Sequence, residues 1–245
     1  MSDALRILGA LALAAPLAAG AGDLEIAPVL VELSPEARTA LVSVRNAGRQ
    51  PARYQARAYE WGQASDGATV LTPAKDLVLF PPLLELLPGE TRNLRLGTDA
   101  APGPSERSWR LFVEELPRRE TSTGAPQVQV LTRIGVPVFL APAQRTAKAE
   151  IAFLPAEGAR VRFTLRNVGS VRIRPSAVTL TLLSADDQPL LERSLEAWYV
   201  LAGGERVYEI EVPAGACARA AKAVAAAALD DGAVVGRAAA RCRAP

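Results

Sequence analysis

One short motif occurs twice in this chain, and both copies stand between segments of the same kind. The residues VRNAG at 44–48 return as LRNVG at 165–169, which is 121 residues further on. Asparagine and glycine tolerate positive φ angles, so both copies are expected to form hairpin turns between two strands. A second pair, LLPGE at 86–90 and VLAGGE at 200–205, follows in the same order. Two motifs repeated in one order predict two domains of similar topology.

Segments in which apolar and polar residues alternate recur throughout both copies, with turn residues between them. This is the pattern of short half-buried strands, and about seven of them per copy is typical of an immunoglobulin-like β-sandwich. We therefore expect an all-β fold of two immunoglobulin-like sandwiches in tandem, over residues 23–143 and 149–245, with a linker at 141–148. The expected strands are 24–33, 39–44, 53–61, 77–80, 91–96, 109–116 and 128–139 in the first copy, and 149–153, 160–166, 173–183, 190–197, 206–212, 219–229 and 233–241 in the second.

The first 22 residues have the features of a cleavable signal peptide. Arg6 precedes an uncharged apolar run from Ile7 to Ala21 that ends in small residues. The run is shorter than the roughly 20 residues that a membrane-spanning helix needs, which favours cleavage after export over anchorage. The mature protein is therefore expected to be exported.

Cys217 and Cys242 are the only cysteines, and an even pair in an exported chain predicts one disulfide. Between them, Asp231-Gly232 is a strong signal for a two-residue hairpin turn. Such a hairpin would place the two cysteines nearly opposite each other at its open end. Because the segment 218–228 is rich in alanine, a helix there is the alternative.

The composition excludes most familiar kinds of catalytic site. The chain has no histidine, which removes Ser-His-Asp and Cys-His catalysis and histidine-ligated metal sites. Neither a GxGxxG nor a P-loop pattern occurs. The formal net charge of +2 is spread along the chain, without the basic block that indicates nucleic-acid binding. We expect no enzyme activity, no cofactor, no metal, no nucleic-acid partner and no small-molecule substrate.

Two further groups of residues are expected to have structural roles. Trp61, Trp109 and Trp198 are expected to pack in a core or at a domain interface rather than stack on a ligand. Glu114 and Glu115 are adjacent on an expected strand, so their side chains should point to opposite faces. They are therefore not expected to work together as an acid and a base.

The segment QVQVLTRIGVPVFL at 127–140 is expected to be a long strand with one exposed side, because polar and apolar residues alternate in a core rich in valine and isoleucine. A polar loop at 118–126 separates it from the strand expected at 109–116. Two interpretations are open. The segment is either an ordinary core strand after a surface loop, or a strand whose free edge pairs with another protein, since an unpaired edge recruits other chains.

These features together resemble the periplasmic chaperones of bacterial pilus assembly, over nearly all of the chain after the first 22 residues. Each motif is weak alone, and their order and spacing make the likeness specific. The resemblance rests on LEIAP at 24–28, Asn46 and Gly48, Pro81-Pro82 with LPGE at 87–90, RLFVEELP at 110–117, RIGVPVF at 133–139, Asn167 to Gly169 and WYVL at 198–201.

The resemblance implies two immunoglobulin-like domains in a boomerang arrangement, and a chaperone that folds and caps pilus (fimbrial) subunits and delivers them to an outer-membrane usher. In this family the subunit is a sandwich that lacks its last strand, and the last strand of the chaperone's first domain fills the gap. On this resemblance the donor side chains are Val128, Val130, Thr132 and Ile134. A secreted immunoglobulin-like binding or adhesin module is the alternative.

The family's better-known branch holds the subunit's terminal carboxylate with an arginine of the first strand and a lysine of the last. The corresponding residues here are Leu30 and Gly135, and neither side chain can bind an anion. This departure resembles a divergent, archaic-type branch. Other arginines are candidates for the anchor, because a guanidinium group binds a carboxylate with two hydrogen bonds, and for each of them a solvated surface charge is the alternative. The candidates, in order, are Arg133, Arg110, Arg95 and Arg92.

Overall fold

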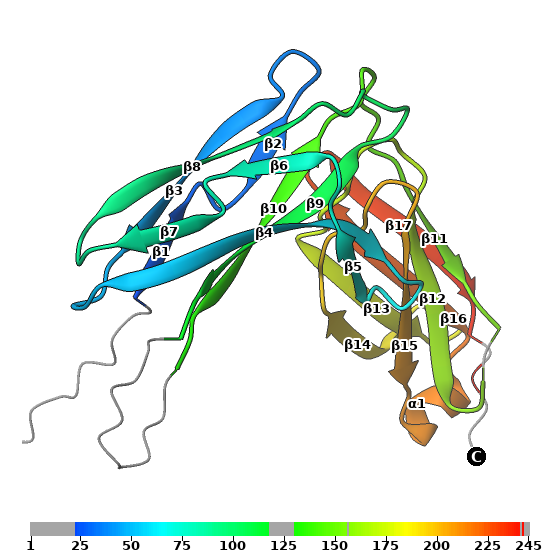
Figure 1. The fold of residues 1–245 in the computed structure, drawn as a ribbon. Coiled ribbons are helices and arrows are strands. Elements are labelled where there is room, and N and C mark those ends of the chain that lie inside the picture. The colour runs from blue at the N-terminus through cyan, green and yellow to red at the C-terminus, as the bar shows by residue number, and fades with distance from the viewer. Residues whose placement is uncertain (1–22, 118–129, 156, 241, 243–245) are drawn as a thin grey trace, which may run out of the picture.

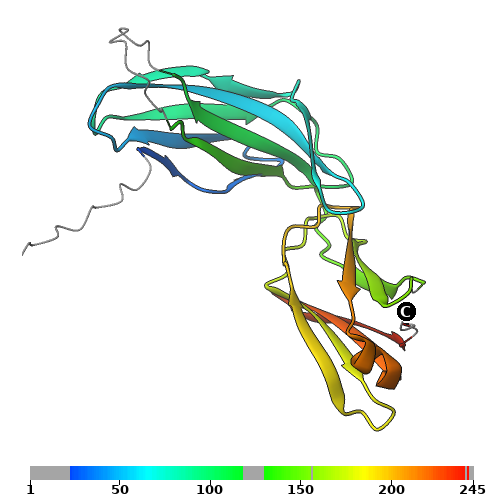
Figure 2. The ribbon, with the colours of Figure 1, turned by 90° about the horizontal axis from the view of Figure 1, so that it is seen from below.

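Two β-sandwiches that meet at a bend make up the protein (Figure 1), and Figure 2 shows the bend from a second side. The computed structural model describes residues 23–117, 130–155, 157–240 and 242. Each sandwich has its own cluster of buried apolar side chains. The all-β fold of two immunoglobulin-like sandwiches in tandem is thereby confirmed. In the part of the chain described, no helix combines the length and the apolar character needed to cross a membrane.

The first sandwich packs a four-stranded sheet against a six-stranded one, with Tyr54, Leu94 and Trp109 buried between them. The strand expected at 24–33 divides around Pro28, because its first part pairs in one sheet and its second part in the other. In spatial order the four-stranded sheet has β1 (Leu24–Ala27), β3 (Thr39–Asn46), β8 (Thr91–Thr98) and β6 (Leu77–Phe80), and the six-stranded sheet has β2 (Val31–Leu33), β10 (Arg133–Leu140), β9 (Arg107–Glu115), β4 (Ala52–Gln63) and β5 (Thr69–Pro73), with β7 (Leu83–Leu86) paired to β4.

The second sandwich packs a three-stranded sheet against a four-stranded one around a core that includes Phe163, Leu165 and Leu180. A short helix, α1 (Ala214–Arg219), follows the last strand of the three-stranded sheet. The three-stranded sheet has β11 (Ala149–Phe153), β12 (Arg160–Asn167) and β15 (Glu205–Glu211), and the four-stranded sheet has β14 (Pro189–Leu195), β13 (Ala177–Leu183), β16 (Lys222–Leu229) and β17 (Gly232–Ala239).

The repeated asparagine motif is a crossing between sheets, so the prediction of hairpin turns is wrong. Asn46 ends β3 in one sheet, and the chain continues into β4 in the opposite sheet. The same change of sheet separates β12, which ends at Asn167, from β13. Strands joined in this way share no ladder of hydrogen bonds, so the connecting residues need other partners.

The asparagine side chain supplies those partners in both copies. Asn46 is fully buried, and its Nδ2 donates to the carbonyls of Gln50 at 2.8 Å and Leu86 at 3.1 Å, while its Oδ1 accepts from the Gly48 N–H at 3.0 Å. One side chain thus ties the crossing to the end of β7. Asn167 makes the same three contacts, with Val171, Val200 and Gly169.

Replacing Asn46 with alanine should lower the free energy of unfolding of the first sandwich by about 2 kcal/mol, because two buried carbonyls lose their donor. Urea unfolding followed by circular dichroism measures the change. Asn93→Ala is the matched control, since the Asn93 side chain is exposed and accepts a hydrogen bond from the exposed Ser43 hydroxyl. Equal loss in the two variants would contradict a special role for Asn46.

The last two strands, β16 and β17, form the predicted hairpin, with Asp230 and Asp231 in the turn between Leu229 and Gly232. The turn lies one residue earlier than predicted. The alternative of a helix over 218–228 is wrong, because the small side chains of β16 alternate between the core and the outer face, as a strand requires. Those that face the core are Ala223, Ala225 and Ala227.

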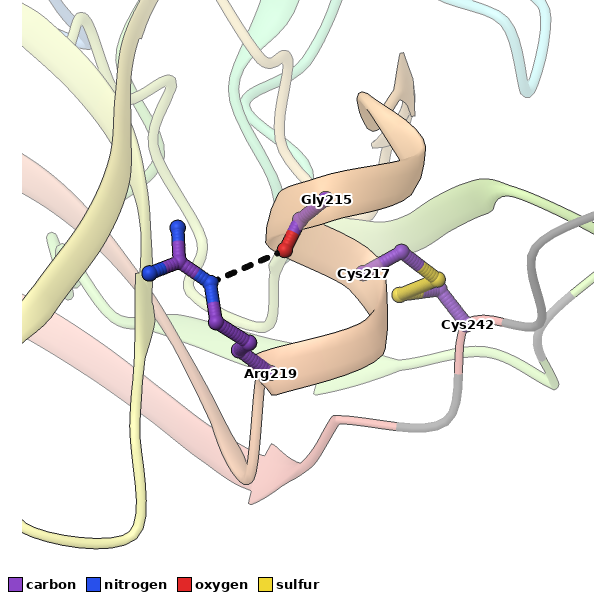
Figure 3. Close-up of a disulfide and its surroundings, with 4 residues drawn as sticks. All are labelled: Gly215, Cys217, Arg219 and Cys242. Carbon is purple, nitrogen blue, oxygen red and sulfur yellow. Dashed lines mark hydrogen bonds between the residues drawn. A yellow bond between two sulfur atoms is a disulfide. The ribbon is translucent and has the colours of Figure 1, made fainter.

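A disulfide joins Cys217 to Cys242, as Figure 3 shows. Cys217 lies in α1, which the sequence did not predict, and Cys242 follows β17. In the same helix the Arg219 Nε donates to the Gly215 carbonyl at 3.1 Å (Figure 3). The disulfide therefore links the helix to the chain end, next to the open end of the hairpin.

A glutamine of the first sandwich reaches into the second at the bend. The Gln63 Nε2 donates to the Tyr199 carbonyl at 2.7 Å, and its Oε1 accepts from the Leu201 N–H at 2.8 Å. Just beyond β4, the Ser65 carbonyl accepts from the Val207 N–H at 3.0 Å. The connection from β4 to β5 is therefore docked on the second sandwich through main-chain atoms.

A buried charge cluster crosses the same junction. Arg172 of the second sandwich donates to Glu106 at 2.6 Å and to Glu32 at 2.5 Å, and its guanidinium lies 3.8 Å from the centroid of the Phe139 ring. The Arg172 N–H also donates to Glu106 at 3.0 Å. Burial raises the pKa of the Glu106 carboxyl, and its hydrogen bonds and charge pairing with Arg172 oppose that shift.

Candidate functional site

Strand β10 has one edge that is only partly paired. It pairs with β9 along its whole length, from Arg133 to Leu140, but with β2 only from Val138 onward. In the residues described, the stretch from Arg133 to Pro137 has no strand on its second side. Pro137 has no N–H to donate, which suits the place where the free edge ends. An open edge of this kind can accept a strand from another chain.

The four predicted donor residues lie in and before this strand. Ile134 lies on β10 and packs against the core of the first sandwich. Thr132 and Val130 precede β10, and the Val130 side chain is 83% exposed. Val128 lies outside the described residues. The roles of all four as donor residues remain a prediction.

The strand is shorter than predicted, since β10 begins at Arg133 and residues 130–132 are not part of it. The reason is that β9 ends at Glu115, shortly after the pairing of Glu114 with Arg133. A strand needs a neighbour to form its hydrogen bonds, and just before Arg133 the Thr132 carbonyl accepts one from the Glu115 N–H at 2.8 Å. The exposed Val130 is therefore next to the end of the sheet.

The outer face of the six-stranded sheet, which turns toward the second sandwich, carries arginines stacked on aromatic rings. The Arg133 guanidinium lies 3.9 Å from the centroid of the Phe112 ring, and its Nε is 3.6 Å from Glu114. Tyr59 meets Phe112 edge-on at 5.7 Å. Arg133, the first of the predicted anchors, is therefore half-exposed with a carboxylate beside it.

Arg110 is more buried than Arg133 and, unlike Arg133, has no carboxylate beside it in the part of the chain described. Its guanidinium lies 4.0 Å from the Trp61 ring centroid and 6.0 Å from that of Trp198. Among the described residues no carboxylate pairs with it, and burial lowers its pKa, while Tyr199 acts in the opposite direction. An arginine stays charged in such surroundings. Of the four candidates, Arg110 is therefore the one whose partly buried positive charge has aromatic rings and no carboxylate beside it in the part of the chain described.

The other two candidates lie elsewhere. Arg95 and Arg92 are on β8, in the sheet opposite to that of Arg110 and Arg133, so the structure does not bring the four arginines together. Arg92 pairs with Glu90 at 2.8 Å. Arg95 is exposed on the outer face of β8, between Leu41 and Phe80 of the neighbouring strands.

The two positions that carry basic residues in the better-known branch are filled by apolar packing here. Leu30 packs against the cluster of Trp61, Phe139, Tyr199 and Leu201 that lies between the sandwiches. Gly135 lies under the Phe112 ring, and a Cβ atom there would be only 2.7 Å from the ring carbon Cε1. A side chain at 135 would therefore displace Phe112.

Several residues that shape this face were not identified from the sequence. Gln63, Glu106 and Arg172 connect the two sandwiches, but a glutamine or an ion pair of residues far apart in sequence gives no local pattern. The tryptophan predictions fit the structure: Trp109 is buried in the first core, while Trp61 and Trp198 lie at the junction. Trp198 nevertheless keeps 40% of its surface exposed.

Comparison with known proteins agrees with this architecture. The family model for the pili and flagellar-assembly chaperone PapD N-terminal domain matches residues 23–146, about half of the chain. No curated protein matches the sequence.

Solved structures with the same fold include three chaperones. In the chaperone–tip adhesin complex CsuC–CsuE of archaic Csu pili from Acinetobacter baumannii, the matched chain has 19% identity and a TM-score of 0.63, with 88% of this chain and 98% of that chain covered. The class 5 fimbriae chaperone CfaA has 13% identity and a TM-score of 0.59, with 91% of this chain and 99% of that chain covered. In the SafA pilin–SafB chaperone complex from Salmonella enterica, the matched chain has 14% identity and a TM-score of 0.55, with 89% of this chain and 98% of that chain covered.

The family match covers the sandwich that holds β10 and the arginine-lined face. The solved structures share the fold across both sandwiches. The family predicted from the sequence is thereby confirmed. The chain belongs to the PapD-like family of pilus-assembly chaperones.

Proposed function

We propose that this protein is a periplasmic chaperone that folds and caps pilus subunits by donor-strand complementation and delivers them to an outer-membrane usher. Residues 1–22 direct its export as a signal peptide. The observation that carries the proposal is the open edge of β10 from Arg133 to Pro137, which continues directly from the exposed Val130. The exported location also suits the disulfide between Cys217 and Cys242.

In this mechanism the subunit lacks one strand of its sandwich, and the segment that leads into β10 takes that place. The backbone of β10 hydrogen-bonds to the subunit, while Val128, Val130 and Thr132 face its core. Ile134, which packs partly against the first sandwich, continues the same face where the two cores meet. Each buried valine or isoleucine would contribute roughly 1.5–3 kcal/mol. Each backbone hydrogen bond would add about 0.5–1.5 kcal/mol. A few such groups give binding that the next subunit can displace.

Arg110 is the best candidate to hold the terminal carboxylate of the subunit, with Arg133 as the second. Both are on the face beside the open edge, and Arg110 lacks a carboxylate partner within the described residues. A bound carboxylate would offset the positive charge that Arg110 holds against two indole rings. An anchor at Arg110, in place of basic residues at positions 30 and 135, would fit an archaic-type branch of the family.

The solved structures also support subunit binding. The CsuC–CsuE and SafA–SafB structures are complexes of a chaperone with a tip adhesin subunit and with a pilin. A secreted immunoglobulin-like binding module is the second candidate. It would bind a folded ligand without stabilising an incomplete subunit.

Co-expression in the periplasm with a pilus subunit encoded beside this gene tests strand donation. The wild type should protect the subunit from degradation and co-purify with it one to one. Val130→Asp should lose the complex, because it places a charge on the donor face. The matched control is Val78→Asp, a change at a valine that is 67% exposed on β6, away from the open edge.

The control should keep the complex, and all three proteins should show the same circular dichroism. Capture of the subunit by Val130→Asp as well as by the wild type would sink strand donation. Failure of the wild type to protect any subunit from the same gene cluster would favour the binding-module function.

A further inference from the structure

The second sandwich places aromatic rings next to Arg110 of the first sandwich. The exposed Trp198 ring meets Tyr199 edge-on at 5.5 Å, and its centroid is 6.0 Å from the Arg110 guanidinium carbon. The ring of Trp61, from the first sandwich, has its centroid 4.0 Å from the same guanidinium carbon. Arg110 thus contacts one buried indole and has a second, partly exposed indole nearby.

The position of this surface is fixed by the first sandwich. Gln63 holds the main chain on both sides of Val200 through its hydrogen bonds to Tyr199 and Leu201. Trp198 immediately precedes this clamped stretch. The contact between the two sandwiches therefore fixes the main chain that carries the indole, in addition to the contacts of the ring with Tyr199 and Arg110.

The charge of the region is suited to an anion. Arg174 lies 5.4 Å from the Tyr199 ring centroid, and like Arg110 it pairs with no carboxylate in the part of the chain described. Within the described residues, each ring of the aromatic pair thus has an arginine nearby that no carboxylate pairs with. A ligand that complements this surface needs a negative charge for Arg110 and an apolar group for the exposed face of Trp198.

We propose that Trp198 is a specificity-determining residue, which selects polypeptides that end in a large apolar or aromatic residue. The terminal carboxylate binds Arg110, and the side chain of the same residue packs on the indole of Trp198. The 6.0 Å between guanidinium and indole allows one residue to reach both. The inference rests on the proposed function, in which the ligand is the end of a pilus subunit.

Small probes test this site separately from strand donation. N-acetyl-L-phenylalanine, N-acetyl-L-phenylalaninamide and N-acetyl-L-alanine are titrated into the mature protein, and the three indole N–H signals are followed by NMR. The phenylalanine carboxylate should shift the Trp198 signal saturably. The alanine probe should bind about fivefold more weakly because it lacks the ring. The amide should bind about tenfold more weakly because it lacks the charge.

Variants assign the two preferences to their residues. Trp198→Ala, at an exposed position, should abolish the preference for phenylalanine over alanine and keep that for carboxylate over amide. Arg110→Gln should do the reverse. Gln63→Ala should weaken the phenylalanine preference, since the indole is no longer held in place. Val168→Ala, at a similarly exposed valine of the second sandwich, should change neither preference.

Equal binding of the phenylalanine and alanine probes by the wild type would overturn the assignment, and so would an undiminished phenylalanine preference in Trp198→Ala. Either result leaves the Val130→Asp experiment unaffected, because co-purification through β10 does not depend on Trp198. A failure of strand donation with intact probe selectivity would instead show a terminus-binding site in a protein of another function.

Discussion

Replacing Arg172 with methionine should lower the free energy of unfolding by about 3–5 kcal/mol, because the change leaves Glu106 buried without its counter-charge. The Arg172 side chain is only 13% exposed and that of Glu106 only 1%. Methionine keeps much of the side-chain volume, so the loss reflects charge rather than a cavity. Urea unfolding at neutral pH measures the difference, with separate probes for each sandwich.

The matched control is Arg166→Met, which removes an arginine of the same sandwich that pairs with Glu205 at 3.4 Å in an exposed position. Exposed pairs contribute about 0–1 kcal/mol, so this variant should differ little from the wild type. The double variant Arg172→Met/Glu106→Gln should recover part of the loss. Comparable losses in Arg172→Met and Arg166→Met would mean that the junction cluster does not act as a buried pair.

The loss in free energy of unfolding caused by Arg172→Met should also depend on pH. Burial raises the pKa of Glu106 in the folded protein, and removing Arg172 takes away the groups that oppose this shift. A carboxyl group whose pKa is raised in the folded state stabilises the protein most at a pH below its unfolded-state pKa, about 4.3. This stabilisation is lost as the pH rises through the folded-state pKa. The deficit should therefore shrink from pH 7 toward pH 4. A constant deficit would exclude Glu106 titration as its cause.

Removing the disulfide should lower the free energy of unfolding of the second sandwich by about 3 kcal/mol, since the bond closes a loop of 25 residues that is otherwise free in the unfolded chain. The double variant Cys217→Ser/Cys242→Ser measures this by hydrogen exchange, which reports on each sandwich separately. Protection of β3 and β8 in the first sandwich should stay at the wild-type level.

A second measurement guards against an effect of the serine hydroxyl itself at the buried position 217. Wild-type protein with its disulfide reduced and alkylated under denaturing conditions, then refolded, should show the same loss confined to β13, β16 and β17. Full protection of those strands after removal of the bond would contradict a stabilising role. Loss in both sandwiches would indicate that the junction, and not the loop, depends on the disulfide.

The fold could be predicted because alternation in a strand is a local pattern. The prediction failed where pairing with neighbouring strands decides which sheet a segment joins. The alternation at 24–33 continues across Pro28, so nothing local shows that β1 and β2 pair in different sheets. Strand β5 is mostly exposed and has no apolar alternation to reveal it. The Asn46 motif has the residues of a turn, and only the sheet assignment of β4 shows that it crosses the sandwich.

The candidate site was predicted less completely, because its parts come from different strands and domains. The apolar pattern around β10 was visible, but its open edge depends on where β2 stops pairing. The ranking of Arg133 above Arg110 reflected sequence proximity to Gly135. Our proposal of the opposite order rests on the contacts of Arg110 with Trp61 and Trp198, and Trp198 comes from a segment of the other sandwich.

The contact made by Gln63 has an evolutionary consequence. Its two partners in the second sandwich are main-chain atoms of Tyr199 and Leu201, so their hydrogen bonds do not depend on which side chains those positions carry. This contact therefore constrains the side chain at 63 and leaves the side chains at 199 and 201 unconstrained by it. Since residue 198 takes no part in these two hydrogen bonds, an exchange of its side chain is compatible with the same docking of the two sandwiches at this point.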